Sequence, residues 1–463
     1  MKASRWFAGI GAALAALAGR GFEKNVIAAP ATATGLRERI DRLARPMIDG
    51  GVAVGFVIGV LHDGKSDFFA YGEAARGSGV SPGPDTVYEI GSITKVFTGL
   101  LLADAVQRGE VGLDDPVQKH LGTAATMPVR GEPITLAHLA SHTSGLPRLP
   151  DNFEPRDRED PYADYTVVQS YAFLGAHTLR RAPGEYEYSN YGGGLLGHVL
   201  SLRAGRSYEV LLIERVLMPL GLGDTRITLT LDQRRRLVPG YDASLRPARN
   251  WELPTLAGAG ALRSTPRDML AFAKASLETS GPLARAFTLA QRKRASVPGG
   301  LAVGLGWHIA ADGTTLWHDG GTGGYRSWLA VLPDRKLAVV LLANTAAERL
   351  TALGEDVTRA AAGIDVPTRA APTEIAVDPR VLETYAGSYA LSPDFELSVT
   401  VEDGRLMVRA TGQEKYPVFA SAPGKFFYKV VDAQLTFVTG GDGRVERVIL
   451  HQGGRDTPGV RKR

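Results

Sequence analysis

Cysteine is absent from this chain of 463 residues. The absence excludes disulfide bonds, thiolate metal ligands, cysteine nucleophiles and lipid attachment at an N-terminal cysteine. A chain without thiols is also suited to an oxidising compartment.

The chain has little excess charge of either sign. Its formal net charge is +4, and no block of Lys or Arg stands out beyond the last residues, Arg461-Lys462-Arg463. We therefore expect no nucleic-acid partner, because proteins that bind nucleic acids carry a basic patch or stripe. Hydrophobic residues make up 44% and charged residues 22%, as in soluble globular proteins, and the length favours more than one domain.

The apolar run at the N-terminus is too short to cross a bilayer, which takes ~20 apolar residues. Lys2 and Arg5 precede this run, Trp6 to Ala18, which ends in the small-residue pattern Ala16-Leu17-Ala18. This pattern is typical of a secretory signal peptide, and a second cleavage motif is Ala31-Thr32-Ala33. We expect a periplasmic or secreted protein with no membrane span after removal of the signal. The alternative is a buried helix of the mature protein.

Within residues 35–362, the β-rich segments lie at the two ends. A hairpin is expected over 52–71, and four strands are expected at 304–309, 315–318, 327–332 and 338–344. The middle alternates helical stretches with Gly- and Pro-rich loops, and a long apolar helix is expected over 92–107. This arrangement predicts an α/β sandwich whose antiparallel sheet is built from both ends of the domain, with a helical lobe.

Short alternating strands follow a Pro- and Ala-rich linker at 363–378. They are expected at 387–391, 396–401, 405–410, 425–431, 434–438 and 445–451, separated by turns such as Glu402-Asp403-Gly404. The pattern predicts a small all-β unit. The expected organisation is therefore a leader at 1–34, an α/β domain at 35–362, the linker, and an all-β domain at 379–463.

Ser92 and Lys95 form the only Ser-x-x-Lys pair of the chain and lie at the start of the long apolar helix. Positions i and i+3 share one face of a helix, so the Lys95 ammonium can reach the Ser92 hydroxyl. A serine hydroxyl is a poor nucleophile until a base takes its proton. The N-terminus of a helix also favours the negative charge that develops in acyl transfer. The alternative is an N-capping serine beside a solvated lysine.

Two further motifs contain polar groups and glycines suited to the same chemistry. Tyr188-Ser189-Asn190 follows Pro183-Gly184; a lysine beside Tyr188 would lower its pKa and make it a general base, and the Asn190 amide can bind a substrate carbonyl. His318-Asp319-Gly320-Gly321 closes a strand whose glycines allow close approach of a ligand. The N–H groups of Ser92 and Gly321 could then form an oxyanion hole. Taken alone, Tyr188-Ser189-Asn190 is more often a tyrosine in a Gly-rich turn.

Together the three motifs resemble the serine β-lactamase and penicillin-binding-protein superfamily, whose S-x-x-K, Y-x-N and K-T-G or H-x-G motifs match them in order. The stretches 89–92, 134–147 and 320–324 are similar to the class C branch, and the resemblance covers residues 36–362. It implies Ser92 as nucleophile, Lys95 and Tyr188 as catalytic groups, and substrate contacts by Asn190, His318 and Gly320. The tail resembles the lipocalin-like β-barrel often attached to such proteins.

Other arrangements of catalytic residues fit less well. Gly79-Val80-Ser81-Pro82-Gly83 matches the nucleophile-elbow pattern, but Pro82 lacks the N–H that the elbow requires. His138 and His142 have the spacing of zinc ligands, but Leu139 replaces the glutamate of H-E-x-x-H. A Ser–His–Asp triad through His318 is possible in principle, but Lys95 and Tyr188 make it unnecessary. We expect no metal and no cofactor.

His318 and Asp319 stand where a K-T-G motif has a lysine and a threonine. A neutral histidine and an aspartate would disfavour anionic substrates, so small neutral esters or amides are the first expectation. The alternative is a β-lactamase, a D-Ala-D-Ala carboxypeptidase or a D-aminopeptidase, with Arg326 supplying the positive charge. A third hypothesis is a non-catalytic penicillin-binding scaffold. The sequence does not specify an oligomeric state.

Overall fold

The computed structural model describes residues 33–367 and 374–462, apart from 414, 430, 432, 442, 453 and 454. The predicted export signal at residues 2–18 lies outside this part of the chain, as do residues 368–373 of the predicted linker. Within the described residues, no helix has the length and apolar character needed to cross a membrane.

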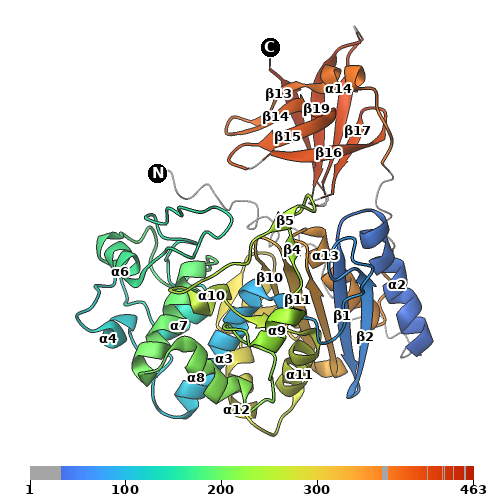
Figure 1. Ribbon diagram of the computed structural model, residues 1–463. Coiled ribbons are helices and arrows are strands. Elements are labelled where there is room, and N and C mark those ends of the chain that lie inside the picture. The colour runs from blue at the N-terminus through green and yellow to red at the C-terminus, as the bar shows by residue number, and fades with distance from the viewer. Residues whose placement is uncertain are drawn as a thin grey trace.

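An eight-stranded antiparallel sheet forms the centre of the α/β domain (Figure 1). Strands from the two ends of the domain's sequence meet in this sheet, where β1 pairs with β12 and Gly59 lies opposite Val340. The fold predicted from the sequence is therefore confirmed. In spatial order the strands are β2 Lys65–Gly72, β1 Gly55–His62, β12 Leu337–Ala343, β11 Arg326–Leu332, β10 Leu316–Gly321, β9 His308–Ile309, β8 Leu301–Val303 and β7 Ala295–Val297.

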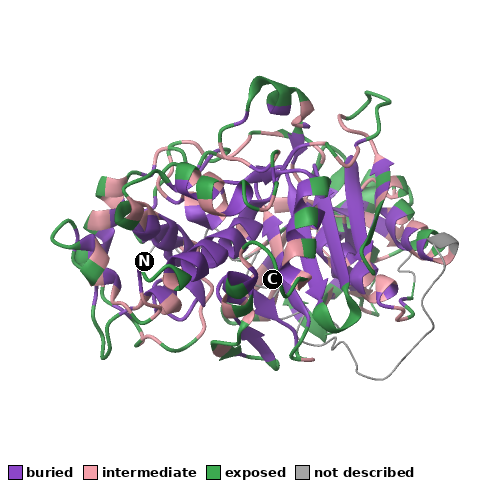
Figure 2. Ribbon diagram, turned by 90° about the horizontal axis from the view of Figure 1, so that it is seen from below, coloured by how far each residue is buried: buried purple, intermediate pink, exposed green. Residues whose placement is uncertain are grey.

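Both faces of the sheet are covered by helices, which explains why β11 and β12 are buried along their whole length (Figure 2). On one face, α2 (Ala33–Asp49) and α13 (Arg349–Ala361) pack over the strands and share a core that includes Ile40, Phe56 and Val357. On the other face, α11 (Pro266–Leu277) packs on β1, β11 and β12.

The helical lobe is built around α3 (Thr94–Gln107), which is buried on all sides from Thr94 to Ala105. Its sequence is apolar all round, as expected for a helix inside a large core rather than on a surface. The other helices of this part of the chain have the following bounds: α4 Val117–Leu121, α5 Leu136–Ala140, α6 Val167–Ala176, α7 Asn190–Ala204, α8 Tyr208–Leu212, α9 Leu231–Arg236, α10 Ala257–Gly260 and α12 Ala284–Gln291. Of these, α5, α7, α8, α10 and α12 contact α3.

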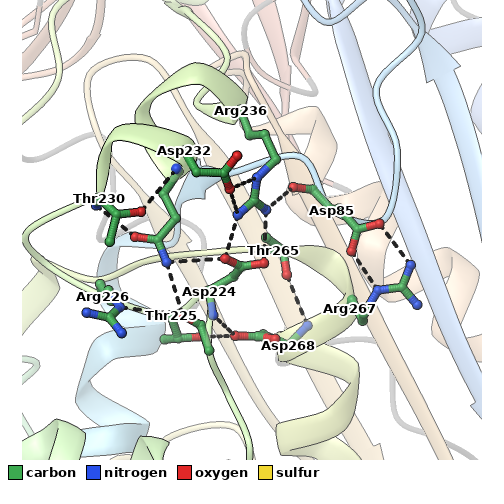
Figure 3. A network of polar contacts seen from close by, with 12 residues as sticks. Asp85, Asp224, Thr225, Arg226, Thr230, Asp232, Arg236, Thr265, Arg267 and Asp268 are labelled. Atoms are coloured by element: carbon green, nitrogen blue, oxygen red, sulfur yellow. Dashed lines mark hydrogen bonds and ion pairs between the residues drawn. The ribbon is translucent and has the colours of Figure 1, made fainter.

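A polar network fixes the segment that leads into α3 (Figure 3). Arg236, at the end of α9, donates two hydrogen bonds to Asp224, and Arg267 of α11 donates two to Asp85. The Arg236 carbonyl accepts from the N–H of Val87, which precedes β3 (Tyr88–Glu89). The network therefore holds the chain just before Ser92 in place.

The C-terminal domain is a closed antiparallel barrel of eight strands, with α14 (Pro379–Tyr385) beside it (Figure 1). Side chains such as Tyr389, Leu435 and Val448 fill its interior. The strands are β13 Gly387–Ser392, β14 Phe395–Glu402, β15 Arg405–Ala410, β16 Lys415–Ala422, β17 Lys425–Tyr428, β18 Ala433–Thr439, β19 Val445–Gln452 and β20 Arg455–Arg461. The sequence did not predict β16 or β20, which contain Pro417 and Pro458 respectively.

A small hairpin of the α/β domain packs against the barrel. It consists of β4 (Gly240–Tyr241) and β5 (Pro247–Ala248), and its Ala243 packs against the barrel core (Figure 1). At its base the Tyr241 N–H donates to the carbonyls of Gly324 and Asn344, 3.1 and 3.0 Å away. Because Gly324 follows the β10 motif, the hairpin links the barrel to the vicinity of that motif.

Candidate active site

Ser92 lies half-buried in a 3-10 turn, Gly91–Ile93, that runs directly into α3. The expected position at the N-terminus of the long helix is confirmed. Gly91 has a φ of +49°, and a Cβ there would lie 2.7 Å from the Gly321 nitrogen. A glycine is therefore required for strand β10 to approach the turn that presents Ser92.

Lys95 is one turn further along, and only 3% of it is exposed. Its Nζ lies 3.0 Å from Ser92 Oγ, 2.9 Å from Asn190 Oδ1 and 2.7 Å from the Ala259 carbonyl oxygen. Three segments that are distant in sequence, α3, the start of α7 and α10, therefore meet at one amine.

Burial lowers the pKa of Lys95 well below its ordinary value, and the nearby Arg148 charge lowers it further. A neutral amine has two N–H donors and one lone pair. The Asn190 amide oxygen and the Ala259 carbonyl accept hydrogen bonds but cannot donate them, so they take the two N–H groups. The lone pair then faces Ser92 Oγ. This geometry suits Lys95 to accept the serine proton.

Tyr188 lies beside this amine, with Lys95 Nζ 5.0 Å from its ring centroid. The His142 ring packs on it at 4.4 Å, and the Arg148 guanidinium carbon lies 5.1 Å from the centroid. Burial raises the pKa of Tyr188, although Arg148 and a hydrogen bond with Ser92 act in the opposite direction. The expectation of a lowered pKa is therefore wrong, because burial of the phenol outweighs the effect of nearby positive charge. The phenol is suited to donate a proton.

The Tyr188-Ser189-Asn190 motif does not lie in a Gly-rich turn but leads into α7. Ser189 caps this helix by accepting from the Gly192 N–H at 2.8 Å, and it donates to the Pro147 carbonyl at 2.7 Å. Asn190 is the first helical residue. The glycines that follow belong to the helix, and a Cβ at Gly193 would lie 3.1 Å from Lys95 Cε. They provide the space in which Lys95 crosses α7.

His318 lies near Tyr188, with the two ring centroids 6.2 Å apart. Its Nδ1 donates to the Asp319 carbonyl at 2.6 Å, so Nε2 carries the lone pair and has no hydrogen-bond partner among the described residues. Burial lowers the pKa of His318 to about 3. His318 is therefore neutral and can accept a hydrogen bond from a ligand, but it cannot supply a positive charge.

Gly320 and Gly321 bring the end of β10 against the turn that presents Ser92. A Cβ on Gly320 would lie 2.0 Å from the Ile90 carbonyl oxygen, and one on Gly321 would lie 2.2 Å from Arg326 Nη1. The approach places the backbone of Gly321 next to that of Gly91, the residue before Ser92. The paired N–H groups of Ser92 and Gly321 stay a prediction for an oxyanion hole.

Arg326 lies opposite Gly321 in the β10–β11 ladder and is buried. It forms an ion pair with Glu348, which balances its charge. Its predicted role as the cation for a substrate carboxylate is thereby weakened. Burial raises the pKa of the neighbouring Asp319, while the charges of Arg326 and Arg148 oppose the rise.

Two groups in the site were not predicted from the sequence. The Ala259 carbonyl has no sequence motif, because any residue carries this acceptor. Arg148, which lies over Tyr188, follows directly after the Ile134–Pro147 stretch that carries the family resemblance. Its position next to this stretch is the signal in the sequence that points to a cation in the site.

His138 and His142 have separate structural roles. His138 Nδ1 accepts from the Thr135 N–H in the capping box of α5, and His142 Nδ1 accepts from the Ser189 N–H at 3.2 Å. His142 thus fixes the loop that carries Tyr188. Within the described residues, no group of three or more His, Asp or Glu side chains could hold a metal ion.

Comparison with known proteins gives matches to both domains. Residues 40–362 match the model of the beta-lactamase family, and residues 371–460 match a domain of unknown function, DUF3471. The D-alanyl-D-alanine-carboxypeptidase/endopeptidase AmpH of Escherichia coli (strain K12) is 33% identical over 325 residues, which cover 65% of this chain and 82% of that protein. A beta-lactamase of Pseudomonas fluorescens is 28% identical over 353 residues, 67% of this chain and 94% of that protein.

One solved structure also aligns with this chain. The beta-lactamase/D-alanine carboxypeptidase from Yersinia pestis, crystallised in complex with citrate, aligns with a TM-score of 0.64 at 27% sequence identity. The alignment covers 72% of this chain and 99% of that one.

Proposed function

Because this chain belongs to the beta-lactamase family, whose related proteins are serine hydrolases, we propose that it hydrolyses a carbonyl substrate through an acyl-enzyme on Ser92. The observation that carries the proposal is the Lys95 amine, which is buried, held by two carbonyl acceptors and 3.0 Å from Ser92 Oγ.

In the proposed mechanism, Lys95 takes the Ser92 proton as Oγ attacks the carbonyl carbon. The N–H groups of Ser92 and Gly321 donate hydrogen bonds to the oxyanion. The Tyr188 phenol donates its proton to the leaving group and is reprotonated from the Lys95 ammonium. Water then attacks the acyl-enzyme along the same proton route in reverse. Tyr188 takes the water proton and passes its own proton to Lys95, and the Lys95 ammonium returns a proton to Ser92 Oγ. Asn190 holds Lys95, and His318 Nε2 accepts from the substrate.

For the substrate, we propose β-lactams or D-alanine-terminated peptides ahead of small neutral esters or amides. The preference for neutral substrates rested on repulsion by Asp319. Burial raises the pKa of this carboxyl, which weakens the repulsion, and the similar AmpH is a D-alanyl-D-alanine-carboxypeptidase/endopeptidase. Export from the cytoplasm is part of the same proposal, on the strength of the N-terminal pattern.

The test is turnover by three purified proteins: the wild type, Ser92→Ala and Ser81→Ala. Ser81 is an exposed serine in the discarded G-x-S-x-G pattern, so its variant is a matched control. The substrates are a D-Ala-D-Ala peptide, a chromogenic cephalosporin and short-chain p-nitrophenyl esters. We expect Ser92→Ala alone to abolish turnover. Retention of most activity by Ser92→Ala would refute the proposal, and faster ester than peptide or β-lactam turnover would reverse the substrate order.

A further inference from the structure

Arg148 is a partly buried cation beside Tyr188, and the mechanism above does not use it. Its backbone carbonyl accepts from the Tyr191 N–H at 3.1 Å, and the preceding Pro147 carbonyl accepts from Ser189 Oγ. The start of α7 therefore fixes the backbone of Arg148. Its side chain lies over Tyr188, with Cζ 5.1 Å from the ring centroid.

This guanidinium lacks a counter-ion among the described residues. Its Nε is buried and has no hydrogen-bond partner there, and no carboxylate lies within ion-pair distance. Two more deeply buried arginines differ in this respect: Arg326 pairs with Glu348, and Arg263 pairs with Glu89 and Glu252. A buried N–H donor without a partner is costly, so this side chain is completed best by an anion from outside the chain.

The position of Arg148 indicates which part of the substrate it meets. It stacks on Tyr188, the group proposed to pass a proton to the leaving group. An anion that contacts Arg148 therefore belongs to the leaving-group portion. Among common anions, a carboxylate matches the planar fork of a guanidinium with two parallel hydrogen bonds.

We propose that Arg148 binds a carboxylate on the leaving-group portion of the substrate and so selects anionic substrates over neutral ones. The inference rests on the proposed function, since it needs hydrolysis at Ser92. It assigns to Arg148 the role that the sequence had suggested for Arg326, whose charge Glu348 balances. Arg148 is a specificity-determining residue and takes no part in proton transfer.

The test uses two thioesters that differ in one group, hippuryl-thioglycolic acid and its methyl ester. Both carry the same acyl group and the same scissile bond, but only the acid has a leaving-group carboxylate. The proteins are the full-length wild type, Arg148→Gln, Arg148→Lys and the control Arg156→Gln. Arg156 is an exposed arginine of the same lobe, with 93% of its side chain accessible.

The measured quantity is the ratio of kcat/KM for the acid to kcat/KM for the ester, at the pH optimum of each protein. We expect the ratio to fall about 10- to 100-fold in Arg148→Gln, as for loss of a hydrogen bond to a charged group. Arg148→Lys keeps the charge without the fork and should lie between. Arg156→Gln should keep the wild-type ratio. The thermal unfolding midpoint establishes that each variant is folded.

An unchanged ratio in Arg148→Gln, or an equal loss with both thioesters, overturns the inference and leaves the serine mechanism intact. Turnover of both thioesters by Ser92→Ala, or of neither by the wild type, overturns the proposed function and this inference with it. The two failures are therefore distinguishable.

Discussion

Two carbonyl oxygens, from Asn190 and Ala259, determine the direction of the Lys95 lone pair. The sequence predicted that Lys95 approaches Ser92, because residues i and i+3 lie on one helical face. It did not predict the state of the amine, since the pKa depends on burial under α7 and α10. The same cause explains Tyr188, whose pKa burial raises although the motif suggested a lowered value.

The pH dependence of hydrolysis tests the role of Lys95. Below its pKa the amine is protonated and has no lone pair, so kcat/KM for a neutral ester should fall as the pH is lowered through that pKa. Because burial lowers this pKa well below the ordinary 10.5, the acid limb should lie far below pH 10.5, with a plateau above it. Lys95→Ala should lose the plateau. An acid limb near 10.5 would show that Lys95 is an ordinary solvated lysine.

At the scale of elements, the site depends on close approach between backbones. Gly306 has a φ of +76°, and a Cβ there would lie 2.2 Å from the Lys95 carbonyl oxygen. Of the single strand predicted at 304–309, only β9 (His308–Ile309) forms, because residues 304–307 turn to fit against α3 after β8 has ended at Val303. Sequence periodicity identifies a strand but not a break that an adjacent helix imposes, which is why this element was predicted only in part.

Gly193 provides a direct test of this packing. In Gly193→Ala the new Cβ would lie 3.1 Å from Lys95 Cε and 3.3 Å from its Cδ, while hydrogen bonds hold Nζ on three sides. We expect kcat to fall roughly ten- to a hundredfold, because a small displacement of a catalytic group is costly. Steady-state kinetics and thermal unfolding measure the two effects separately.

The matched control is Gly175→Ala in α6, where an added Cβ has no neighbour within 4 Å. It should keep wild-type kinetics, with stability unchanged or raised by up to ~1 kcal/mol, as expected for alanine in a helix. Equal kinetics in both variants would mean that Lys95 adjusts freely and that α7 does not constrain it.

At the scale of the whole molecule, the described residues form separate cores in the α/β domain and in the barrel. The sequence predicted both domains, because their hydrophobic periodicities differ. It missed β16 and β20, where Pro417 and Pro458 interrupt the strand pattern. Both prolines are tolerated in the ladder of the closed barrel, opposite Met407 and Ile449.

The separate cores predict separate unfolding. Leu435 is fully buried in the barrel, and Leu435→Ala should destabilise that domain by about 2–5 kcal/mol. Scanning calorimetry should show a lower barrel transition and an unchanged α/β transition, with turnover kept at temperatures where the barrel is unfolded. Val460→Ala, at a 66% exposed position of β20, is the control and should shift neither transition. A joint shift of both transitions would mean that the domains unfold as one cooperative unit.

The central claim is that one hydroxyl, activated by a neutral lysine, attacks the substrate. Intact-mass measurement after treatment with a fluorophosphonate tests it most directly, with peptide mapping to locate the adduct. We predict a single adduct on Ser92 in the wild type, none in Ser92→Ala at an unchanged unfolding temperature, and slower labelling in Lys95→Ala. An adduct on another serine, or full labelling of Ser92→Ala, would contradict the account.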